Sequence, residues 1–432
     1  MRRALVLGLG KSGMAAAGFL LRRGWRVVGL EGSAARLQDP QFIAQAQRMG
    51  LEYRSDREPI DATLFDELIV SPGVSPTHPV YQQALAQNLQ IVGEVELALR
   101  YLHQPMVAVT GTNGKTTVTL LVEHVLKSVG KRARALGNVG EPLCDYVDAA
   151  DPEEILVVEL SSYQLETMNG RVFDAAVLLN ITPDHLDRYV DMKAYAEAKC
   201  RLQECLKAGA PFFVHISVVS SFGELLKPGY RTYSCLEDGE NIELIWPLGY
   251  RLMGKHDRDN ALAAFRLCEP WGVTAQEFCR GLETFKKPAH RLEFVSEIDG
   301  VRYVDDSKGT NIDAVVQAVG AMSGPVVLIA GGVDKGASYL PWKEAFGARV
   351  KQMVVIGDAA EKIEGELRHH FVIARADSLA SAVEKAAKIA ERGDTVLLSP
   401  GCSSYDMFRD YAHRGEVFQQ SVKNLESLSE RR

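Results

Sequence analysis

A glycine-containing loop between an apolar segment and a helical segment constrains the fold of this chain more than any other feature. The segment Met106–Thr110 is apolar, as expected for a buried strand, and the loop Gly111–Thr117 follows it directly. A helical pattern then extends to Val129. A strand that enters a helix through a glycine turn is typical of a parallel sheet covered by helices, so the sequence predicts an α/β fold.

The residues of this loop suit a nucleotide phosphate. Gly111 and Gly114 let backbone N–H groups approach phosphate oxygens that a side chain would keep away. Lys115 adds positive charge for the outer phosphates, and the Thr116 hydroxyl could join the shell of a Mg²⁺ ion. The strict Walker pattern requires glycine at the position of Val109, so a plain strand-to-helix turn stays open as the alternative. We expect ATP to bind the loop residues Gly111, Thr112, Asn113, Gly114, Lys115, Thr116 and Thr117.

Strand-like and helix-like segments alternate in three regions of the chain, which predicts three domains. The N-terminal region is Rossmann-like, and the middle region contains the phosphate loop, as in a P-loop ATPase. The segment Phe285–Arg291 reads as a linker before a C-terminal Rossmann-like region, because Pro288 disfavours helix at the residue before it. We place the three domains at residues 1–93, 94–287 and 288–432.

The expected strands are runs rich in Val, Ile and Leu, which suit parallel sheets buried on both faces. In the N-terminal region they are Arg3–Leu7, Trp25–Leu30 and Leu64–Val70. In the middle region Ile155–Leu160 and Ala175–Asn180 join Met106–Thr110. In the C-terminal region they are Arg302–Asp305, Val326–Ala330, Met353–Gly357, Val372–Arg375 and Thr395–Ser399. The stretch Ile216–Leu252 is less regular, and its strands cannot be placed from the sequence. Asn260–Trp271 is helical, and the charged end Glu426–Arg432 is expected to be frayed.

Charge and cysteine content exclude several classes of protein. The net charge of -7 over 432 residues provides no basic surface for nucleic acid or an anionic membrane. The 7 cysteines are scattered without a Cys-x-x-Cys pair, which argues against a disulfide framework and a structural zinc site. Lys11 and Ser12 interrupt the apolar start of the chain, so a signal peptide is not expected, and no segment is long enough to span a bilayer. We expect a cytoplasmic protein with small-molecule substrates.

Three acidic or basic residues near strand ends are candidates for chemistry. Glu159 lies near the end of the strand Ile155–Leu160, where an acidic Mg²⁺ ligand is expected, although a solvated carboxylate is the alternative. His185 follows another strand, and by itself it would more often be a structural histidine. Glu31 follows the second strand after a Gly-x-Gly-x-x-Gly motif at residues 8–13, which leaves an NAD-dependent dehydrogenase as a rival interpretation.

The loop and several other blocks carry a family resemblance. The segment Thr110–Thr116 resembles the ATP loop of the Mur ligases and folylpolyglutamate synthases. Blocks along nearly the whole chain are similar to Mur ligases, namely Glu159–Glu166, Asn180–Tyr189, Ala289–Glu293, Asp306–Asn311 and Leu398–Ser404. The resemblance implies an ATP-dependent amide ligase of peptidoglycan precursor synthesis that forms an acyl phosphate and uses two Mg²⁺ ions.

Within this family, two sequence features favour the members that add D-glutamate to UDP-N-acetylmuramoyl-L-alanine. The chain lacks an Asp-Asn-Pro-Arg block, which is typical of the meso-diaminopimelate-adding type. It also has a Rossmann-like region before the ATP loop, which folylpolyglutamate synthases lack. A Mur-type ligase for a different amino acid stays open, as does a nucleotide switch without ligase activity.

The same resemblance assigns roles to individual residues. It implies that the catalytic residues are Lys115, Glu159, His185 and Lys199, and that the metal ligands are Thr116, Glu159, His185 and a carbamylated Lys199. From the sequence alone, Lys199 reads as an exposed helical lysine. Beyond the loop, ATP would contact Asn260, Arg291 and Asp306. The UDP-sugar would contact Gly10, Lys11, Ser12, Glu31, Ser71, Pro72, Gly73 and Asn138. D-Glutamate would contact Lys308, Thr310, Lys335, Ser404, Tyr405 and Tyr411.

Two positions depart from the family pattern. Asp257 stands where the family commonly has asparagine, and because an ionised aspartate can only accept hydrogen bonds, Asn260 is the better candidate for the adenine contact. Tyr405 is larger than the aliphatic residue expected there, which predicts a differently shaped glutamate pocket. We expect a hinge at Lys286–His290 and a monomeric enzyme.

Overall fold

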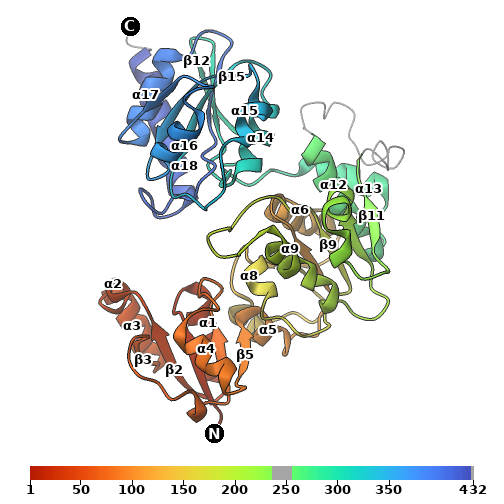
Figure 1. Cartoon of the computed structure of the whole chain (residues 1–432). Coiled ribbons are helices and arrows are strands. Elements are labelled where there is room, and N and C mark those ends of the chain that lie inside the picture. Colours follow the sequence, from red (N-terminus) through yellow and green to blue (C-terminus); the bar gives the residue numbers. More distant parts are fainter. Residues whose placement is uncertain (236–254, 430–432) are drawn as a thin grey trace. The chain divides into compact units, whose positions relative to one another are not determined.

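A computed structural model describes residues 1–235 and 255–429 of the chain. The strands form three sheets, one in each predicted region (Figure 1). The described residues group into two compact units. The first unit consists of the described residues within 1–180, 193–247 and 259–284, and it contains the first and second sheets. The second unit consists of the described residues within 181–192, 248–258 and 285–432, and it contains the third sheet. The predicted α/β class with three sheet-containing domains is confirmed.

The first sheet is parallel throughout, with the strand order β3-β2-β1-β4-β5. Its strands are β1 (Arg3–Leu7), β2 (Arg26–Glu31), β3 (Glu52–Ser55), β4 (Glu67–Val70) and β5 (Gln90–Gly93). The helices of this region are α1 (Lys11–Arg22), α2 (Ala34–Leu37), α3 (Pro40–Met49) and α4 (Pro79–Ala86). The glycine turn follows β1 at the point where the strand order reverses, which is where ligand crevices lie in such sheets.

The second sheet is also parallel, with the order β11-β10-β9-β6-β8-β7. Its strands are β6 (Met106–Thr110), β7 (Ala133–Gly137), β8 (Ile155–Glu159), β9 (Ala175–Leu178), β10 (Phe212–His215) and β11 (Arg231–Tyr233). The helices are α5 (Glu94–Leu99), α6 (Lys115–Ser128), α7 (Leu143–Tyr146), α8 (Ser162–Leu165), α9 (Met192–Cys200), α10 (Ile216–Phe222), α12 (Lys255–Cys268) and α13 (Ala275–Thr284). Because β6 lies between β8 and β9, the loops after these three strands meet at one edge of the sheet.

The third sheet has the order β12-β13-β17-β14-β15-β16. Its strands are β12 (Glu293–Ile298), β13 (Val301–Asp305), β14 (Val326–Gly331), β15 (Val350–Ile356), β16 (Ile373–Arg375) and β17 (Thr395–Leu398). Its helices are α14 (Ile312–Gly320), α15 (Pro341–Phe346), α16 (Ala360–Leu367), α17 (Leu379–Ile389) and α18 (Tyr411–Ser429). All neighbouring strands are parallel except β12 and β13.

The antiparallel pair of β12 and β13 is an exception within the predicted parallel sheets. The two strands form a hairpin joined by Asp299 and Gly300, which have φ angles of 54° and 80°. Positive φ at both turn residues is the geometry that an Asp-Gly pair favours in a two-residue hairpin. The turn signal was present in the sequence, but β12 is only partly buried and has no long apolar run.

One other expectation about a chain segment needs correction. The less regular stretch Ile216–Leu252 begins with α10 and β11, and its residues 236–252 lie outside the described part. The expected fraying of Glu426–Arg432 is wrong as far as Ser429, because α18 extends to that residue. No helix in the described ranges is long and apolar enough to cross a membrane.

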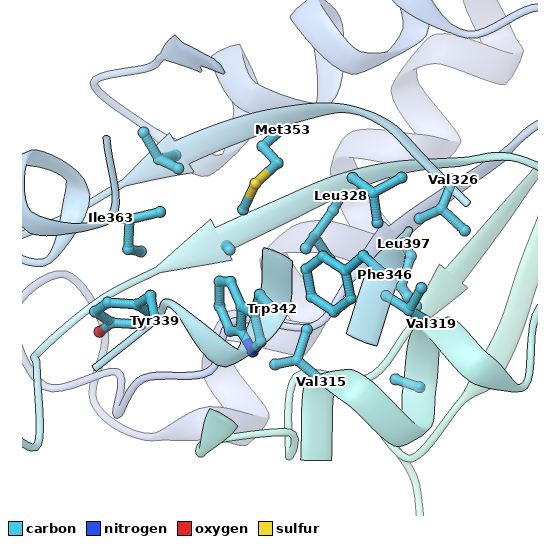
Figure 2. Packing of buried hydrophobic residues seen from close by; sticks show 14 of the residues in the cluster. Val315, Val319, Val326, Leu328, Tyr339, Trp342, Phe346, Met353, Ile363 and Leu397 are labelled. Carbon is cyan, nitrogen blue, oxygen red and sulfur yellow. The ribbon is translucent and has the colours of Figure 1, made fainter. Parts of the chain in front are cut away.

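A buried hydrophobic cluster that includes Trp342 and Phe346 anchors one site-bearing loop of the third domain (Figure 2). Trp342 stacks on Phe346 with ring centroids 5.3 Å apart, and its Nε1 donates to the carbonyl of Ile312 at 3.0 Å. The side chain of Cys402, just after β17, belongs to the same cluster. The chain that leads to Ser404 is therefore fixed by the core.

Candidate active site

The phosphate loop is held by polar contacts with the neighbouring strand end. The backbone N–H of Thr112 donates to the carbonyl of Asn180 at 2.8 Å, and the N–H of Asn113 donates to Oδ1 of Asn180 at 2.8 Å. Nδ2 of Asn180 returns a hydrogen bond to the carbonyl of Asn113 at 3.0 Å. Nζ of Lys115 donates to the carbonyls of Gly111 and Thr112 at 2.9 and 2.8 Å. The loop is thus preformed, with its lysine folded over it.

Gly114 ends the loop in a conformation that explains its residue type. Its φ is 86°, a left-handed conformation, and α6 begins at the next residue. A Cβ at this position would collide with the side-chain amide of Asn260. Asn260, expected near adenine, therefore lies against the phosphate loop.

Glu159 ends β8 beside the loop, with a side chain that is 1% exposed. Nδ2 of Asn138 donates to its Oε1 at 2.7 Å. Oε2 is buried and has no hydrogen-bond partner within the described ranges. A buried carboxylate oxygen without a partner is costly, so this atom fits a metal ligand whose ion completes its environment. The alternative of a solvated carboxylate is wrong.

Lys199 is also 1% exposed, so the reading of this residue as an exposed helical lysine is wrong. Its Nζ donates to the carbonyl of Gly111 at 2.8 Å and lies 4.7 Å from the ring centre of Tyr195. The hydroxyl of Tyr195 is in turn 3.2 Å from Oγ1 of Thr112. A sequence signal existed, because Lys199 is four residues after Tyr195 and so shares the buried face of α9. The structure thereby brings Lys199 to the phosphate loop.

The N-terminal glycine turn is fixed by Glu31. Oε2 of Glu31 accepts from the N–H of Leu9 at 3.0 Å, and Oε1 accepts from the N–H of Ser33 at 2.9 Å. Oγ of Ser71 donates to the carbonyl of Gly8 at 2.6 Å. Both carboxylate oxygens of Glu31 are thus engaged with the backbone, which favours a role in shaping the turn over the ribose contact of a dinucleotide enzyme.

Two other residues of the predicted UDP-sugar group lie where a ligand can reach them. A Cβ on Gly10 would have open space around it within the described residues. Nζ of Lys11 donates to the carbonyl of Gly140 at 2.7 Å, and so links the turn to the loop that carries Asn138. The first two sheets therefore contribute adjoining parts of this group.

In the second unit, Lys335 is paired with a residue that the sequence interpretation did not select. Its Nζ lies 2.9 Å from Oδ1 of Asp184, whose side chain is buried. Oδ2 of Asp184 accepts from Nδ2 of Asn311 at 3.3 Å. His185, next to Asp184, has a φ of 57°. Asp184 and Asn311 lie in the family-like blocks, but nothing in the spacing indicated that they approach Lys335.

The loops that carry Lys335 and Ser404 are joined directly. The N–H of Val333 donates to the carbonyl of Ser403 at 2.9 Å, and the N–H of Ser403 donates back at 3.2 Å. Ser404 is buried, whereas Tyr405 is 74% exposed. These loops thus bring together two members of the predicted glutamate group and leave the Tyr405 ring in solvent.

Asp306 follows β13 and is almost wholly buried. Its Oδ2 accepts from Oγ of Ser399 at 2.7 Å, and its Oδ1 accepts from the N–H of Leu292 at 3.3 Å. Burial raises the pKa of Asp306 to about 7, against the opposing effects of the Ser399 hydrogen bond and the Arg291 charge. The carboxyl is therefore a preformed hydrogen-bonding group beside Arg291.

Three other residues of this unit were predicted to contact D-glutamate, namely Lys308, Thr310 and Tyr411. Nζ of Lys308 is 3.9 Å from the ring centre of Tyr411, in cation–π contact, and Thr310 is half-buried. Nζ of Lys287 lies 2.8 Å from Oδ2 of Asp257. This ion pair engages one oxygen of the Asp257 carboxylate, and Asn260 stays the predicted adenine contact.

Comparisons with known families cover most of the chain. Residues 2–93 match the family described as "Mur ligase MurD-like, N-terminal domain". Residues 109–230 match "Mur ligase middle domain", and residues 290–402 match "Mur ligase, glutamate ligase domain". The three matches follow one another along the chain in the order of the three sheets.

Relatives and solved structures agree with these matches. A UDP-N-acetylmuramoylalanine--D-glutamate ligase from Protochlamydia amoebophila (strain UWE25) is 45% identical over 438 residues, covering 98% of each chain. A ligase of the same name from Alkaliphilus metalliredigens is 35% identical over 448 residues, again covering 98% of each. The structure of MurF from Acinetobacter baumannii has a TM-score of 0.59 at 16% identity, covering 91% of this chain and 90% of that one. The alanine ligase MurC from Thermotoga maritima has a TM-score of 0.56 at 17% identity, covering 98% and 100%. These two structures share the fold.

Proposed function

Because the chain belongs to the Mur ligase family, we propose that it joins D-glutamate to UDP-N-acetylmuramoyl-L-alanine, with ATP converted to ADP and phosphate. The full-length similarity to D-glutamate ligases carries the choice of substrates. The cluster of the phosphate loop, Glu159 and Lys199 supports the chemistry, because it places a lysine, a carboxylate and preformed loop N–H groups together.

In the first step, an oxygen of the L-alanine carboxylate attacks the γ-phosphorus of ATP. The bond from that phosphorus to the β–γ bridging oxygen breaks, ADP leaves, and an acyl phosphate forms. The loop N–H groups and Lys115 stabilise charge on the transferring oxygens, once the Lys115 amine exchanges its carbonyl partners for phosphate. Positioning and electrostatics are sufficient for this step, so no side chain is needed as a covalent nucleophile.

The residues beside the loop fit Mg²⁺. Oε2 of Glu159 is a buried oxygen without a hydrogen-bond partner in the described part of the chain, and the hydroxyl of Thr116 lies at the start of α6. Lys199 becomes an oxygen ligand if its amine is carbamylated, and the family resemblance adds His185 as a further ligand. Bound Mg²⁺ supplies electrostatic stabilisation of phosphate charge. We propose two ions, as in the resemblance.

In the second step, the amine of D-glutamate attacks the acyl carbon. The bond from that carbon to the phosphate oxygen breaks, phosphate leaves, and the amine loses a proton as the amide forms. We propose that Lys335, Ser404 and Thr310 bind the carboxylates of the amino acid, with Lys308, Tyr405 and Tyr411 close to it. The joined loops of Lys335 and Ser404 support this assignment.

ATP and the UDP-sugar are assigned to other groups of residues. Asn260, Arg291 and Asp306 contact ATP beyond the loop in this proposal. The UDP-sugar binds the turn of Gly10, Lys11 and Ser12, and the further residues proposed for it are Glu31, Ser71, Pro72, Gly73 and Asn138. We keep the domain bounds 1–93, 94–287 and 288–432, with 286–290 as hinge, and propose a monomer in the cytoplasm.

A product assay tests the function. Purified enzyme is incubated with ATP, Mg²⁺ and UDP-N-acetylmuramoyl-L-alanine, and a panel of amino acids is added one at a time. We expect phosphate release and a dipeptide product with D-glutamate, and neither with L-glutamate, L-lysine or meso-diaminopimelate. Product with L-lysine or meso-diaminopimelate instead would assign a sister activity, and binding of NADH without ATP binding would favour the dehydrogenase interpretation.

A further inference from the structure

Arg414 lies in the first turn of α18 and is 0% exposed, which is rare for an arginine. Burial lowers the pKa of its guanidinium to about 10, so the group keeps its charge at neutral pH. The nearby carboxylates of Asp406, Asp305 and Asp306 favour the charged form, but among the described residues none of them forms a salt bridge with it. A buried charge is costly unless hydrogen bonds satisfy it, so the hydrogen bonds of Arg414 must account for much of its stability there.

These hydrogen bonds connect two loops. Nε of Arg414 donates to Oγ of Ser307 at 3.0 Å, and Nη2 donates to the carbonyl of Ser307 at 2.8 Å. Nη1 donates to the carbonyl of Cys402 at 3.1 Å and to that of Ser403 at 3.4 Å. One planar group thus holds the loop after β13 and the loop after β17 in a fixed relation.

Both loops carry residues that we assign to substrates. Ser307 stands between Asp306 and Lys308, and the carbonyls of Cys402 and Ser403 lie directly before Ser404. Because β13 and β17 are neighbouring parallel strands, both loops leave the same edge of the sheet. A shift of either loop would change the spacing between Lys308 and Ser404.

Two other residues in the first turns of α18, Gly415 and Gln419, pack beside the strands β12 and β13. A Cβ on Gly415 meets the ring of His290, which leaves room only for hydrogen. Nε2 of Gln419 donates to Oδ2 of Asp305 at 2.9 Å and to Oε2 of Glu293 at 3.3 Å. Although His290, Glu293 and Asp305 cluster as metal ligands do, this amide and the 2.7 Å contact of His290 with Asp305 already engage them.

We propose that Arg414 is a positioning residue that holds the loop of Lys308 against the loop of Ser404 and thereby sets the affinity for the amino-acid substrate. The proposal rests on the proposed function. Lysine does not replace arginine in this role, because its ammonium lacks the planar fork that reaches carbonyls of both loops at once.

Steady-state kinetics of Arg414→Lys test the proposal. We expect the KM for D-glutamate to rise at least about tenfold, because small displacements of binding groups have large effects. The KM for UDP-N-acetylmuramoyl-L-alanine should stay within about twofold, since its proposed site is on the first two sheets. Equal changes in all KM values, or none, would overturn the proposal.

Chemical rescue separates positioning from stability. Arg414→Ala leaves space for a small guanidinium, so added methylguanidinium should restore part of kcat/KM for D-glutamate, whereas methylammonium at the same concentration should not. Rescue by neither ion, in a variant whose circular dichroism matches the unsubstituted enzyme, would contradict the proposal. If both Arg414 variants unfold, Ser307→Ala decides, because it removes only one acceptor, and an unchanged KM for D-glutamate would then overturn the proposal.

A control on the same helix completes the design. Glu426 accepts a hydrogen bond from Ser296 at 2.8 Å, away from both loops, so Glu426→Gln should leave all KM values unchanged. The product assay of the unsubstituted enzyme separates failure of the proposed function from failure of the proposed role of Arg414. If it makes no product with D-glutamate, the proposed function fails, whereas an active enzyme with an unchanged Arg414→Lys variant contradicts only the role of Arg414.

Discussion

Asn138 donates a hydrogen bond to one carboxylate oxygen of Glu159 at 2.7 Å and leaves the other oxygen for a ligand. That other oxygen, Oε2, is buried and has no partner within residues 1–235 and 255–429. A side chain built in this way is destabilising until a cation arrives, which is the arrangement expected of a metal ligand. Asn138, assigned to the UDP-sugar, thus also orients Glu159.

Glu159→Gln should therefore lower kcat by about 10²-fold, the scale seen when a group that stabilises transferring charge is removed. The amide keeps the size and the contact with Asn138 but loses the charge that binds Mg²⁺. The unfolding temperature of the unsubstituted protein should rise with added MgCl₂ and fall with a chelator, whereas that of the variant should respond much less.

The matched control is Glu153→Gln, an exposed carboxylate just before β8 that pairs with Arg132 at 3.7 Å. It should leave both kcat and the response to MgCl₂ unchanged. An active Glu159→Gln enzyme with the normal Mg²⁺ response would remove this residue from the metal site.

Lys199→Ala should lose at least about tenfold in kcat, because a carbamylated side chain would supply a metal ligand that alanine lacks. Added short-chain carboxylates should restore part of the activity by placing oxygen atoms in the vacated space. The control is Lys193→Ala, which removes an exposed lysine on the same helix and should leave kcat unchanged. Phosphate release assays with and without acetate measure both effects, and full activity of the Lys199 variant would contradict the assignment.

The fold and the phosphate loop were predictable because they depend on local patterns. The strand Met106–Thr110 and the loop Gly111–Thr117 are continuous in sequence, and their glycines and apolar residues serve a local geometry. The strand Glu52–Ser55 was missed because it is short, polar and only partly buried, so its pairing with β2 leaves no apolar signal.

The site was less predictable where it depends on contacts between distant segments. Lys199 reads as a surface residue until α9 packs its face on the phosphate loop 88 residues earlier in the chain. Asp184 meets Lys335 across 151 residues, and Arg414 reaches Ser307 across 107. Helical spacing can indicate that Lys199 lies on a buried face, but no periodicity encodes which distant residue any of these side chains contacts.

Lys335→Ala should raise the KM for D-glutamate by about 10- to 100-fold, as expected for the loss of a charge-assisted hydrogen bond to a carboxylate. The KM for ATP should change by less than about twofold, because the loop of Lys335 is tied to Ser403, which stands beside Ser404, and we assign both Lys335 and Ser404 to the amino acid. Lys343→Ala, an exposed lysine on α15, is the control. A larger effect on ATP than on D-glutamate would contradict the amino-acid role of Lys335.

Glu94→Gln should make the protein more stable at alkaline pH. Oε1 of Glu94 accepts from the N–H of Cys144 at 2.6 Å, and burial raises the pKa of Glu94 to about 7 from the ordinary 4.5. Between these values the folded protein holds a proton that the unfolded chain releases, so the stability of the unsubstituted protein falls as pH rises through this window and stays low above it. The loss is about 3 kcal/mol as an upper bound.

The glutamine keeps the acceptor for the Cys144 N–H and has no charge to bury. The gain in stability of the variant over the unsubstituted protein should therefore be small at pH 5 and large at pH 8. Calorimetric unfolding temperatures of both proteins at the two pH values measure this difference, in which the other titrating groups cancel. Glu344→Gln, an exposed residue of α15, should show no such pH-dependent gap. If the difference in unfolding temperature between Glu94→Gln and the unsubstituted protein were the same at pH 5 and pH 8, Glu94 would have the same pKa in the folded and the unfolded chain. Burial beside Cys144 would then not raise the pKa of Glu94.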